Sequence, residues 1–531
     1  MGALLSSLRA TYQSIVSALA LLQDLSTEFN RALHRASESP GVPTPNSEVP
    51  YWLSSPPFPE LVNASSPSLC EVADVAIIGS GIAGAAIARS LLHIEPFGTG
   101  AANKVVVFEA RQLCSGATGR NGGHIKVAPY EVFARYSNAY GKERAVALVR
   151  FQLRHLQALI DVCRHEKIDI AEAREVETVD LFLDGGAFDK AIDDVKEMKK
   201  WLPEVEINIW DKDQAQQKFG VNSSVVGVLS YQAGAIWAYR FVASIWDGLL
   251  KRFPSQLSIE TNTPVESISL SKSGPIGFPY AVRTSRGIVY TRHVVHATNA
   301  FASYLVPGLR DKIVGAKAHM SSQRPGQQFP DLAGARSWSV VCGGAFDYVT
   351  QRPPSSGGAQ GDLMIGGGFM RSLKQGIDQV GLYDDGGSLD ALTVAHIAGI
   401  FPSIFSPKWG EGASLKQVWP GIIALTGDSL PFVGRLDTRF TGRKVQGLEE
   451  GANDTNSYGE WIAAGWSGEG MVWAWLAGTA LGIMIAGKES EELAEVAGRP
   501  GGTLDSWLPK ELLASAKRLR SADISRLASQ L

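Results

Sequence analysis

The chain has 531 residues, enough for two or three domains of ordinary size. Its 50 basic and 53 acidic side chains nearly cancel, which gives no electrostatic case for nucleic acid or an anionic membrane as the principal partner. Hydrophobic residues make up 45% of the chain, as in globular proteins. The 56 glycines show no collagen-like period, so they are expected where the backbone turns tightly or approaches a ligand.

Four scattered cysteines (Cys70, Cys114, Cys163 and Cys342) do not suggest a disulfide framework or a zinc site, and no metal site is predicted. The amino terminus shows no secretory-signal pattern, so an intracellular, cytoplasmic location is expected. Met1 to Ser6 fits the short N-myristoylation pattern, but an ordinary helix start is the favoured interpretation.

Residues 1–37 are predicted to form an amphipathic helix, because apolar side chains recur at three- and four-residue steps. A kink or break is expected between Asp24 and Thr27, where the pattern is interrupted. Packing on its own protein is the favoured role for this helix, and contact with a partner or a membrane surface is the alternative. Residues 38–70, rich in proline and serine, are predicted to be an extended surface linker.

The pattern changes after residue 70. An apolar run over 73–78, a glycine turn, an alanine-rich helix to Leu92 and an apolar run over 104–109 predict a buried, parallel strand–helix–strand unit. The later order of elements predicts an α/β fold: a discontinuous Rossmann-like domain with an inserted, mainly antiparallel α+β domain. The first domain is assigned to 71–165, 256–310 and 416–490, the inserted domain to 166–255 and 311–415, and a carboxyl-terminal tail to 491–531.

An uncharged run from Gly470 to Gly487 formally reaches the length of a membrane span. Its glycines and alanines favour a buried helix packed closely on a sheet. No transmembrane segment is therefore predicted.

The strongest motif is Gly79-Ser-Gly81-Ile-Ala-Gly84, which directly follows the first strand and begins a helix. Gly79 permits the tight turn, Gly81 lets the backbone approach a pyrophosphate, and Gly84 allows close helix–strand packing. The phosphates are expected at the helix amino terminus, around Ile82 and Ala83, where free N–H groups point at them.

Glu109 ends the second strand, 25 residues after Gly84, where it is expected to bind an adenosine ribose. An acid here favours FAD or NAD over NADP. A second glycine-rich loop from Arg111 to His124 follows, and only FAD needs it, because a flavin extends towards a second wall of backbone amides. The cofactor contacts predicted in this stretch are Ala110, Arg111, Ser115, Ala117, Thr118, Arg120, Asn121, Gly122 and Gly123.

With the Ser-Gly-Ala-Thr-Gly-Arg-Asn-Gly-Gly loop at 115–123, the sequence resembles the D-amino-acid oxidase/sarcosine oxidase (DAO) group of FAD-dependent oxidoreductases. The match is best to members, many from fungi, with an amino-terminal helix, and it runs from about Tyr51 to the carboxyl end. Similar motifs follow in order at 263–268, 294–300, 419–434 and 464–471. The resemblance implies further FAD contacts at Val265, Ala297, Thr298, Asn299, Gly421, Gly468, Glu469, Gly470 and Met471.

Three positions depart from the family pattern. Glu469 stands where histidine is common, and a carboxylate there would oppose the charge of a reduced flavin unless it is turned away or protonated. Ala238 stands where proline is common, which puts the local loop geometry in doubt. Residues 419–434 contain no cysteine, so the FAD is expected to be non-covalent.

The resemblance implies oxidation of a C–N bond in an amine or amino acid. Hydride would pass from the α-carbon to flavin N5, the imine would hydrolyse, and O2 or another acceptor would reoxidise the flavin. The expected partners are therefore a small-molecule amine or amino acid and an electron acceptor. Such chemistry needs little acid–base machinery, so catalytic candidates are ranked by placement.

Tyr348 and Arg352 share one face of a strand predicted over 345–352 and are candidates for holding a substrate carboxylate. The alternative is that Tyr348 packs in the sheet while Arg352 is solvated. Lys317 is a candidate for promoting oxygen reduction, with a solvated edge lysine as the alternative. His124 is a candidate for orientation or proton transfer, with a structural turn cap as the alternative.

Two other functions stay open. One is an NAD(P)H-dependent flavin monooxygenase, which Gly427-Asp428 superficially suits. The other is a catalytically silent dinucleotide-binding scaffold whose amino-terminal helix recruits a partner.

Overall fold

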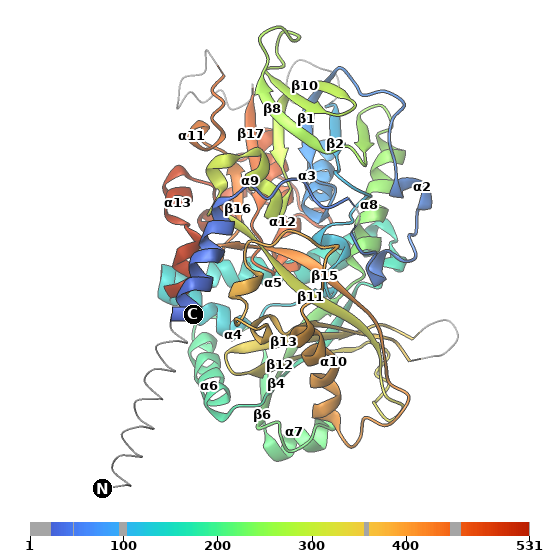
Figure 1. Ribbon diagram of the computed structural model, residues 1–531, viewed down its shortest axis with the longest axis vertical. Coiled ribbons are helices and arrows are strands. Elements are labelled where there is room, and N and C mark those ends of the chain that lie inside the picture. Colours follow the sequence, from blue (N-terminus) through green and yellow to red (C-terminus); the bar gives the residue numbers. More distant parts are fainter. Residues whose placement is uncertain (1–22, 46, 95–102, 355–359, 446–457, 530–531) are drawn as a thin grey trace.

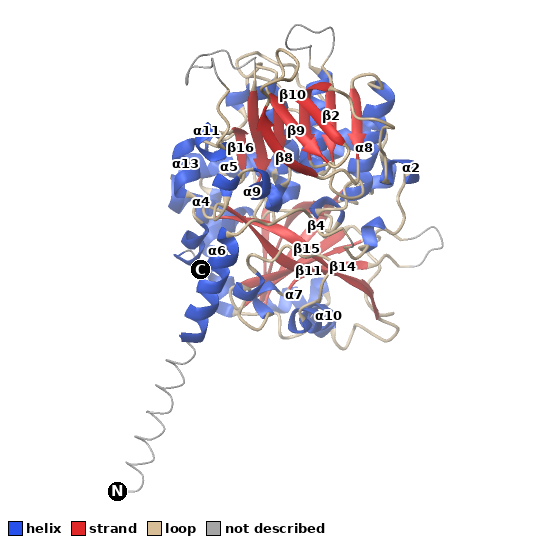
Figure 2. Cartoon of the chain, turned by 45° about the horizontal axis from the view of Figure 1, so that its top comes forward, coloured by secondary structure: helices blue, strands red, loops and turns tan. Residues whose placement is uncertain are grey.

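The computed structural model describes residues 23–45, 47–94, 103–354, 360–445 and 458–529. Two β-sheets form its frame, one in the upper and one in the lower half of Figure 1, and the chain passes from the first to the second and back twice. Figure 2 shows the two layers of strands with helices packed around them. The predicted α/β architecture with two sheet domains is confirmed.

The first sheet is built around parallel strands. Its order is β16-β17-β10-β1-β2-β7, and β9 and β8 extend it beside β10. The strands are β1 (Val72–Ile78), β2 (Val105–Phe108), β7 (Leu257–Glu260), β8 (Val265–Leu270), β9 (Tyr280–Thr284), β10 (Gly287–His296), β16 (Phe432–Arg435) and β17 (Gly459–Ala464). From β7 to β17 the neighbours pair in parallel, and β2 is buried along its length. Burial on both faces explains why these strands are continuous apolar runs.

The second sheet is mainly antiparallel. Its order is β15-β11-β14-β13-β12-β4-β6-β3, with β5 beside β6, and only β12 and β4 pair in parallel along this path. The strands are β3 (His124–Ile125), β4 (Arg174–Phe182), β5 (Ile207–Asp211), β6 (Gly227–Ala235), β11 (Ile313–Arg324), β12 (Arg336–Cys342), β13 (Ala345–Gln351), β14 (Leu363–Gly367) and β15 (Ser414–Thr426).

The pairing differs from the expected domain boundaries in three places. Strands β3 and β15 pair in the second sheet, although residues 71–165 and 416–490 were assigned to the first domain. Helix α8 (Ala238–Arg252), assigned to the inserted domain, contacts α3 (Ile82–His93), and Trp246 on α8 donates to the Ser80 carbonyl at 2.8 Å. Each boundary segment continues an apolar pattern across the change of domain, so periodicity alone does not mark it.

The two faces of the second sheet differ. One is covered by α10 (Ala391–Phe405), where the ring centroids of Trp338 on β12 and Phe401 lie 5.2 Å apart. Because side chains alternate along a strand, Ser337 and Ser339 point to the opposite face. That face lies towards the second glycine-rich loop, since the His124 ring donates to or accepts from Ser337 Oγ at 2.9 Å.

The uncharged run at 470–487 forms α12 (Ala474–Ile485), which is buried throughout. Its closest glycine contacts are with α3: a Cβ on Gly478 would lie 2.8 Å from that of Ala86, and one on Gly482 would lie 2.5 Å from that of Ser90. The predicted buried helix is confirmed. Within the part of the chain that the structure describes, no helix is long and apolar enough to cross a membrane.

The amino-terminal region packs on its own chain. Its described part is helical over 23–37 without a break between Asp24 and Thr27, contrary to the expected kink. Ala36 is buried beside Val314 and Ile524, and Arg35 Nε donates to the Val380 carbonyl at 2.8 Å. The remainder of the predicted helix and the myristoylation pattern lie outside the described residues.

The remaining helices complete the two domains. They are α2 (Pro59–Val62), α4 (Pro129–Tyr140), α5 (Lys142–Glu166), α6 (Gly185–Lys199), α7 (Lys212–Phe219), α9 (Ala302–Leu305), α11 (Thr438–Thr441) and α13 (Ala516–Ser521).

Candidate active site

The turn between β1 and α3 leaves no room for side chains. Gly79 has φ +111°, and a Cβ there would lie 2.5 Å from the Ala297 carbonyl oxygen. A Cβ on Gly84 would overlap the Gly79 carbonyl oxygen. The turn therefore brings backbone from β1, α3 and the end of β10 into close contact, as a site for an extended anionic ligand requires.

The second glycine-rich loop closes this turn from one side. Thr118 Oγ1 accepts from the Ile82 N–H at 3.0 Å, and a Cβ on Gly81 would lie 2.9 Å from that oxygen. The Glu109 carboxylate accepts from the Ser80 N–H at 3.2 Å and from the Ser80 hydroxyl at 2.6 Å. The motifs thus meet at the carboxyl edge of the parallel strands.

Two further segments complete the cradle. Asn299 at the end of β10 accepts at Oδ1 from the Gly465 N–H at 3.1 Å. Asn121 accepts at Oδ1 from the Gly123 N–H at 2.8 Å, and its amide nitrogen lies 3.9 Å from Met471 Sδ. Segments 115–123, 297–299 and 464–471, which are far apart in the sequence, therefore adjoin.

Two other predicted cofactor contacts, Val265 and Gly421, lie near the same edge of the first sheet. The Glu109 carbonyl accepts from the Thr263 N–H at 2.9 Å, which sets Val265 at the start of β8 beside this edge. A Cβ on Gly421 would lie 3.5 Å from that of Arg120. The remaining predicted contacts belong to these same turns and loops. They are Ala83, Ala110, Ala117, Gly468 and Gly470.

Polar atoms in the cradle support a fit with a dinucleotide. Ser115 Oγ, Thr298 Oγ1 and Arg111 Nε are buried and have no partner among the described residues. Buried polar groups in proteins are nearly always satisfied, so these atoms indicate a polar ligand. Open space lies beside Gly116 and Gly468, where an added Cβ would have no atom within 4 Å.

Glu469 is turned towards helices α4 and α5. Its carboxylate accepts from Gln152 Nε2 at 2.9 Å and from the Trp473 indole at 3.3 Å, and it lies 3.6 Å from Arg135. Burial would lower the pKa of Arg135, but Glu469, Tyr136 and Glu131 together more than offset this and raise it. The negative charge of Glu469 is therefore paired.

Tyr348 and His124 lie together against the second glycine-rich loop. A Cβ on Gly122 would overlap the Tyr348 ring, whose centroid lies 6.5 Å from that of His124. The Tyr348 hydroxyl lies 3.0 Å from Met320 Sδ. Burial raises the pKa of Tyr348 to about 12 and lowers that of His124 well below its usual value. At neutral pH the site thus offers a protonated phenol and a neutral imidazole.

Arg352 is not available for the predicted carboxylate fork. It pairs with Glu172 at 2.5 Å, donates to the Tyr51 hydroxyl at 2.7 Å and lies 4.4 Å from the centroid of the Trp237 ring. These partners occupy the guanidinium group. The predicted alternative of a solvated Arg352 does not describe it either.

Lys317 does not join Tyr348. It is separated from Met320 by an odd number of positions along β11, so it points to the opposite face of the sheet. Its Nζ donates to the Ser388 carbonyl at 3.3 Å, and only 7% of the residue is exposed. It is thus neither beside the second glycine-rich loop nor a solvated edge lysine.

The structure shows a polar network that sequence reasoning missed. Lys126 Nζ contacts Asp180 and Ser339, and Asp180 also accepts from the hydroxyls of Tyr231 at 2.7 Å and Tyr130 at 3.0 Å. Burial and the Asp180 charge raise the pKa of both tyrosines. Lys126 follows His124 by two positions, and residues at this spacing share one face of a strand. This spacing is the sequence signal that could have identified Lys126.

We call this surface the polar face. It consists of His124, Lys126, Asp180, Ser337, Ser339 and Tyr348.

Comparison with known proteins identifies the family of this chain. Residues 74–482 match the model of the family described as FAD dependent oxidoreductase (DAO). The chain is 23% identical over 428 residues to the probable oxidoreductase OrdL of Haemophilus influenzae, covering 79% of this chain and 84% of that protein. It is 21% identical over 377 residues to gamma-glutamylputrescine oxidoreductase of Escherichia coli, covering 69% and 77%.

Among solved structures, glycine oxidase from Geobacillus kaustophilus superposes with a TM-score of 0.57 at 18% identity. The superposition covers 80% of this chain and 96% of that one. At this identity the likeness shows a common fold.

Proposed function

Because the match over 74–482 shows that this chain belongs to the family of FAD-dependent oxidoreductases, we propose that it oxidises a C–N bond of an amine or amino acid. The observation that carries the proposal is the contact of Tyr348 with Gly122, which sets a polar side-chain surface directly against the cofactor loop. Relatives named for gamma-glutamylputrescine and glycine support the same substrate class.

The cradle residues hold the cofactor. The backbone from Gly79 to Gly84 and the α3 amino terminus face the diphosphate, and Glu109 takes the ribose. Segments 115–123, 297–299 and 464–471 enclose the remainder of the molecule. When bound, FAD supplies the acceptor for a hydride from the carbon next to nitrogen.

The polar face orients the substrate over the cofactor loop. The Tyr348 hydroxyl remains a donor because burial raises its pKa to about 12. The His124 imidazole remains neutral, so its ring can accept a proton from the substrate amine. A neutral amine is needed, since its lone pair assists the loss of hydride from the neighbouring carbon.

The rival functions find little support in the geometry. Asp428, which suggested a monooxygenase, is paired with Arg518 at 2.7 Å and so has a structural role. A silent scaffold would find support in two departures from the family pattern, Glu469 and Ala238, but the charge of Glu469 is paired. Ala238, the other feature, begins α8 and is buried in a regular helix start.

Visible spectroscopy and an amine panel test the proposal. We expect the purified protein to carry a flavin that acid denaturation releases, and at least one amine or amino acid to drive peroxide release or dye reduction. Flavin bleaching by NADPH with no response to any amine would establish the monooxygenase instead.

Three finer features remain part of the proposal. They are membership of the helix-bearing fungal branch of the family, a cytoplasmic location, and a partner or membrane contact through the amino-terminal helix. The burial of Ala36 favours packing of that helix on its own chain. Cell fractionation of the wild type and Gly2→Ala tests the membrane contact. If the helix binds a membrane through a myristoyl group on Gly2, the Gly2→Ala variant should move to the soluble fraction.

A further inference from the structure

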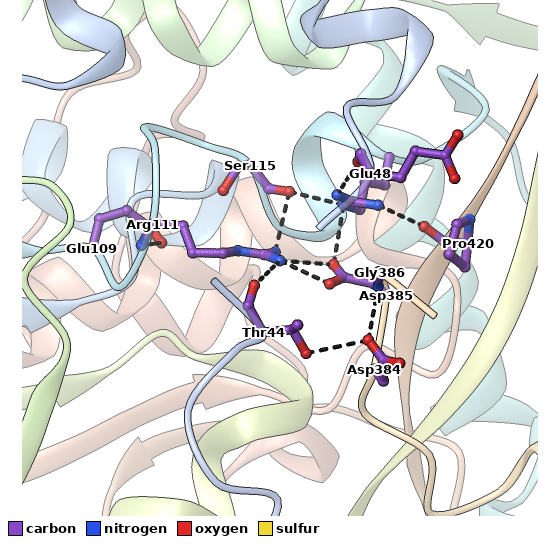
Figure 3. Close-up of polar contacts among 10 residues, drawn as sticks. Thr44, Glu48, Glu109, Arg111, Ser115, Asp384, Asp385, Gly386 and Pro420 are labelled. Carbon is purple, nitrogen blue, oxygen red and sulfur yellow. Dashed lines mark hydrogen bonds and ion pairs between the residues drawn. The ribbon is translucent and has the colours of Figure 1, made fainter. Parts of the chain in front are cut away.

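Two arginines of the second glycine-rich loop converge on one carboxylate (Figure 3). An Arg111 terminal nitrogen lies 2.8 and 3.0 Å from the two oxygens of Asp385, and Arg120 Nε lies 3.1 Å from Asp385 Oδ2. The exposed fractions of the three side chains are 7%, 2% and 4%. Burial lowers the pKa of Arg120 to about 10, and the Asp385 charge opposes this shift. The buried Asp385 carboxylate, with charged partners on two arginines, therefore fixes the positions of both guanidinium groups.

The linker covers this cluster from outside. Arg111 donates to the Thr44 carbonyl at 3.2 Å, and Figure 3 draws this contact. Arg120 donates to the Glu48 carbonyl at 2.6 Å. Arg120 also donates to the Pro420 carbonyl on β15 at 2.8 Å. The two arginines therefore tie the loop to the linker and to the second sheet at once.

The same linker reaches the glycine end of the loop. The Trp52 indole donates to the Asn121 carbonyl, and a Cβ on Gly119 would overlap the Leu53 side chain. Trp52 is 4% exposed, and its carbonyl accepts from the Trp237 indole at 3.0 Å. Residues expected to lie extended over a surface are therefore packed against the loop.

The loop itself has little regular structure to hold it. Its only regular segment among the described residues is a short 3-10 turn, Ala117–Gly119. A glycine-rich segment loses much conformational entropy when it is ordered, and this cost would reduce cofactor affinity unless other contacts order the loop first. The linker lies outside the range 74–482 that the family shares, so these contacts are an addition to the family's core.

We propose that residues 44–45 and 47–53, together with Asp385, form a clasp that holds the second glycine-rich loop in its FAD-binding conformation. Asp385 and Trp52 are positioning residues in this clasp. They act through Arg111, Arg120 and the Asn121 carbonyl.

The test compares two adjacent aspartates. Asp385→Asn removes the charge that both arginines face. Asp384→Asn makes the same change in the same loop, but Asp384 is exposed and accepts from the Thr44 hydroxyl at 3.3 Å and the Gly386 N–H at 2.9 Å. FAD affinity and dissociation rate are measured on each apoprotein by flavin fluorescence, and the urea midpoint of each apoprotein is measured in parallel.

We expect Asp385→Asn to weaken FAD binding by about tenfold or more, mainly through faster dissociation, and Asp384→Asn to stay within about twofold of the wild type. Asp385→Glu, which restores the charge, should recover part of the affinity. Unchanged or tighter FAD binding by folded Asp385→Asn would overturn the proposal of a clasp. Loss of the Asp385 charge leaves the two arginines with more net positive charge, which by itself would favour the anionic cofactor.

A second variant decides the case if Asp385→Asn does not fold. Trp52→Phe keeps an aromatic ring at this position but removes the indole N–H that donates to Asn121 and part of the buried packing. We expect FAD binding to be at least about threefold weaker and the urea midpoint to fall because of the lost packing. Unaltered affinity in this variant would also overturn the clasp. Neither readout uses a substrate, so failure here leaves the proposed C–N oxidation untouched.

Discussion

The cradle at the first sheet and the polar face of the second sheet are built by different means. Backbone shapes the cradle, where a Cβ on Gly84 would overlap the Gly79 carbonyl oxygen. Side chains shape the polar face, where buried Asp180 holds Lys126 and two tyrosine hydroxyls. A site shaped by backbone is broken by adding atoms, whereas a site shaped by paired charges is broken by removing one partner.

Removal of a charge from the polar face should have the largest effect. Asp180→Ala leaves Lys126 buried without its counter-charge, and we expect a loss of about 3–5 kcal/mol in unfolding free energy. Asp194→Ala is the matched control, because its partner Lys190 is 71% exposed and such a pair contributes about 0.5 kcal/mol or less. Urea denaturation measures both. Equal losses in the two variants would contradict the account of the polar face.

Addition of a methyl group to the cradle comes next. Gly84→Ala forces the α3 start away from Gly79, and we expect a loss of about 2–3 kcal/mol together with most of the bound flavin. Gly248→Ala on α8 is the control outside the cradle, because nothing lies within 4 Å of its Cβ. Urea denaturation and the ratio of flavin to protein absorbance measure the two effects. Full flavin content in Gly84→Ala would show that the turn can relax.

Acid should weaken the packing of both domains, because each contains a buried neutral histidine outside the cradle and the polar face. His155 accepts from the Leu476 N–H near the start of α12, and His319 accepts from the Asp390 N–H beside β11. Burial lowers the pKa of each to about 4. The unfolded state, with a histidine pKa near 6.5, binds the proton first, so stability is present above that pH and is lost as the pH falls from 6.5 towards 4.

We expect each histidine to contribute a loss of about 2 kcal/mol between pH 7 and pH 5. Urea midpoints across this range measure the slope, and His155→Gln and His319→Gln should each make it shallower. A slope that neither variant changes would assign the acid sensitivity to other groups.

The smallest expected effect is that of Tyr348→Phe. The variant keeps the ring against Gly122 and removes the hydroxyl, so kcat/KM should fall by about tenfold while flavin content stays unchanged. Steady-state kinetics with the best amine of the panel measure it. Arg352→Ala provides a contrast, because loss of its pair with Glu172 should lower stability more than it alters kcat/KM. A wild-type value of kcat/KM in Tyr348→Phe would show that the Tyr348 hydroxyl has no role in substrate binding or turnover.

The cradle, shaped by backbone, could be predicted from the sequence, whereas the pairing of distant side chains could not. The glycine turn could be predicted because the constraints on Gly79 and Gly84 act within a short segment and recur in every site of this kind. The role of Arg352 could not, because its partners Glu172 and Tyr51 lie 180 and 301 positions away in the chain. Strand alternation placed Tyr348 and Arg352 on one face but did not show that Lys317 points away from it.

The linker shows the same limit. Its proline and serine content indicates extended backbone, which is compatible with either a free segment or a packed one. Contacts such as that of Trp52 with the Asn121 carbonyl distinguish the two, and this contact joins residues 69 positions apart.

The central claim is that the cradle and the polar face together oxidise a C–N bond, and anaerobic flavin reduction tests it most directly. The enzyme is mixed, without oxygen, with its best amine and with the same amine deuterated at the carbon bonded to nitrogen. The account predicts that the amine bleaches the flavin and that deuterium slows the bleaching severalfold. Failure of every amine to bleach the flavin, or bleaching at a rate that deuterium leaves unchanged, would contradict it.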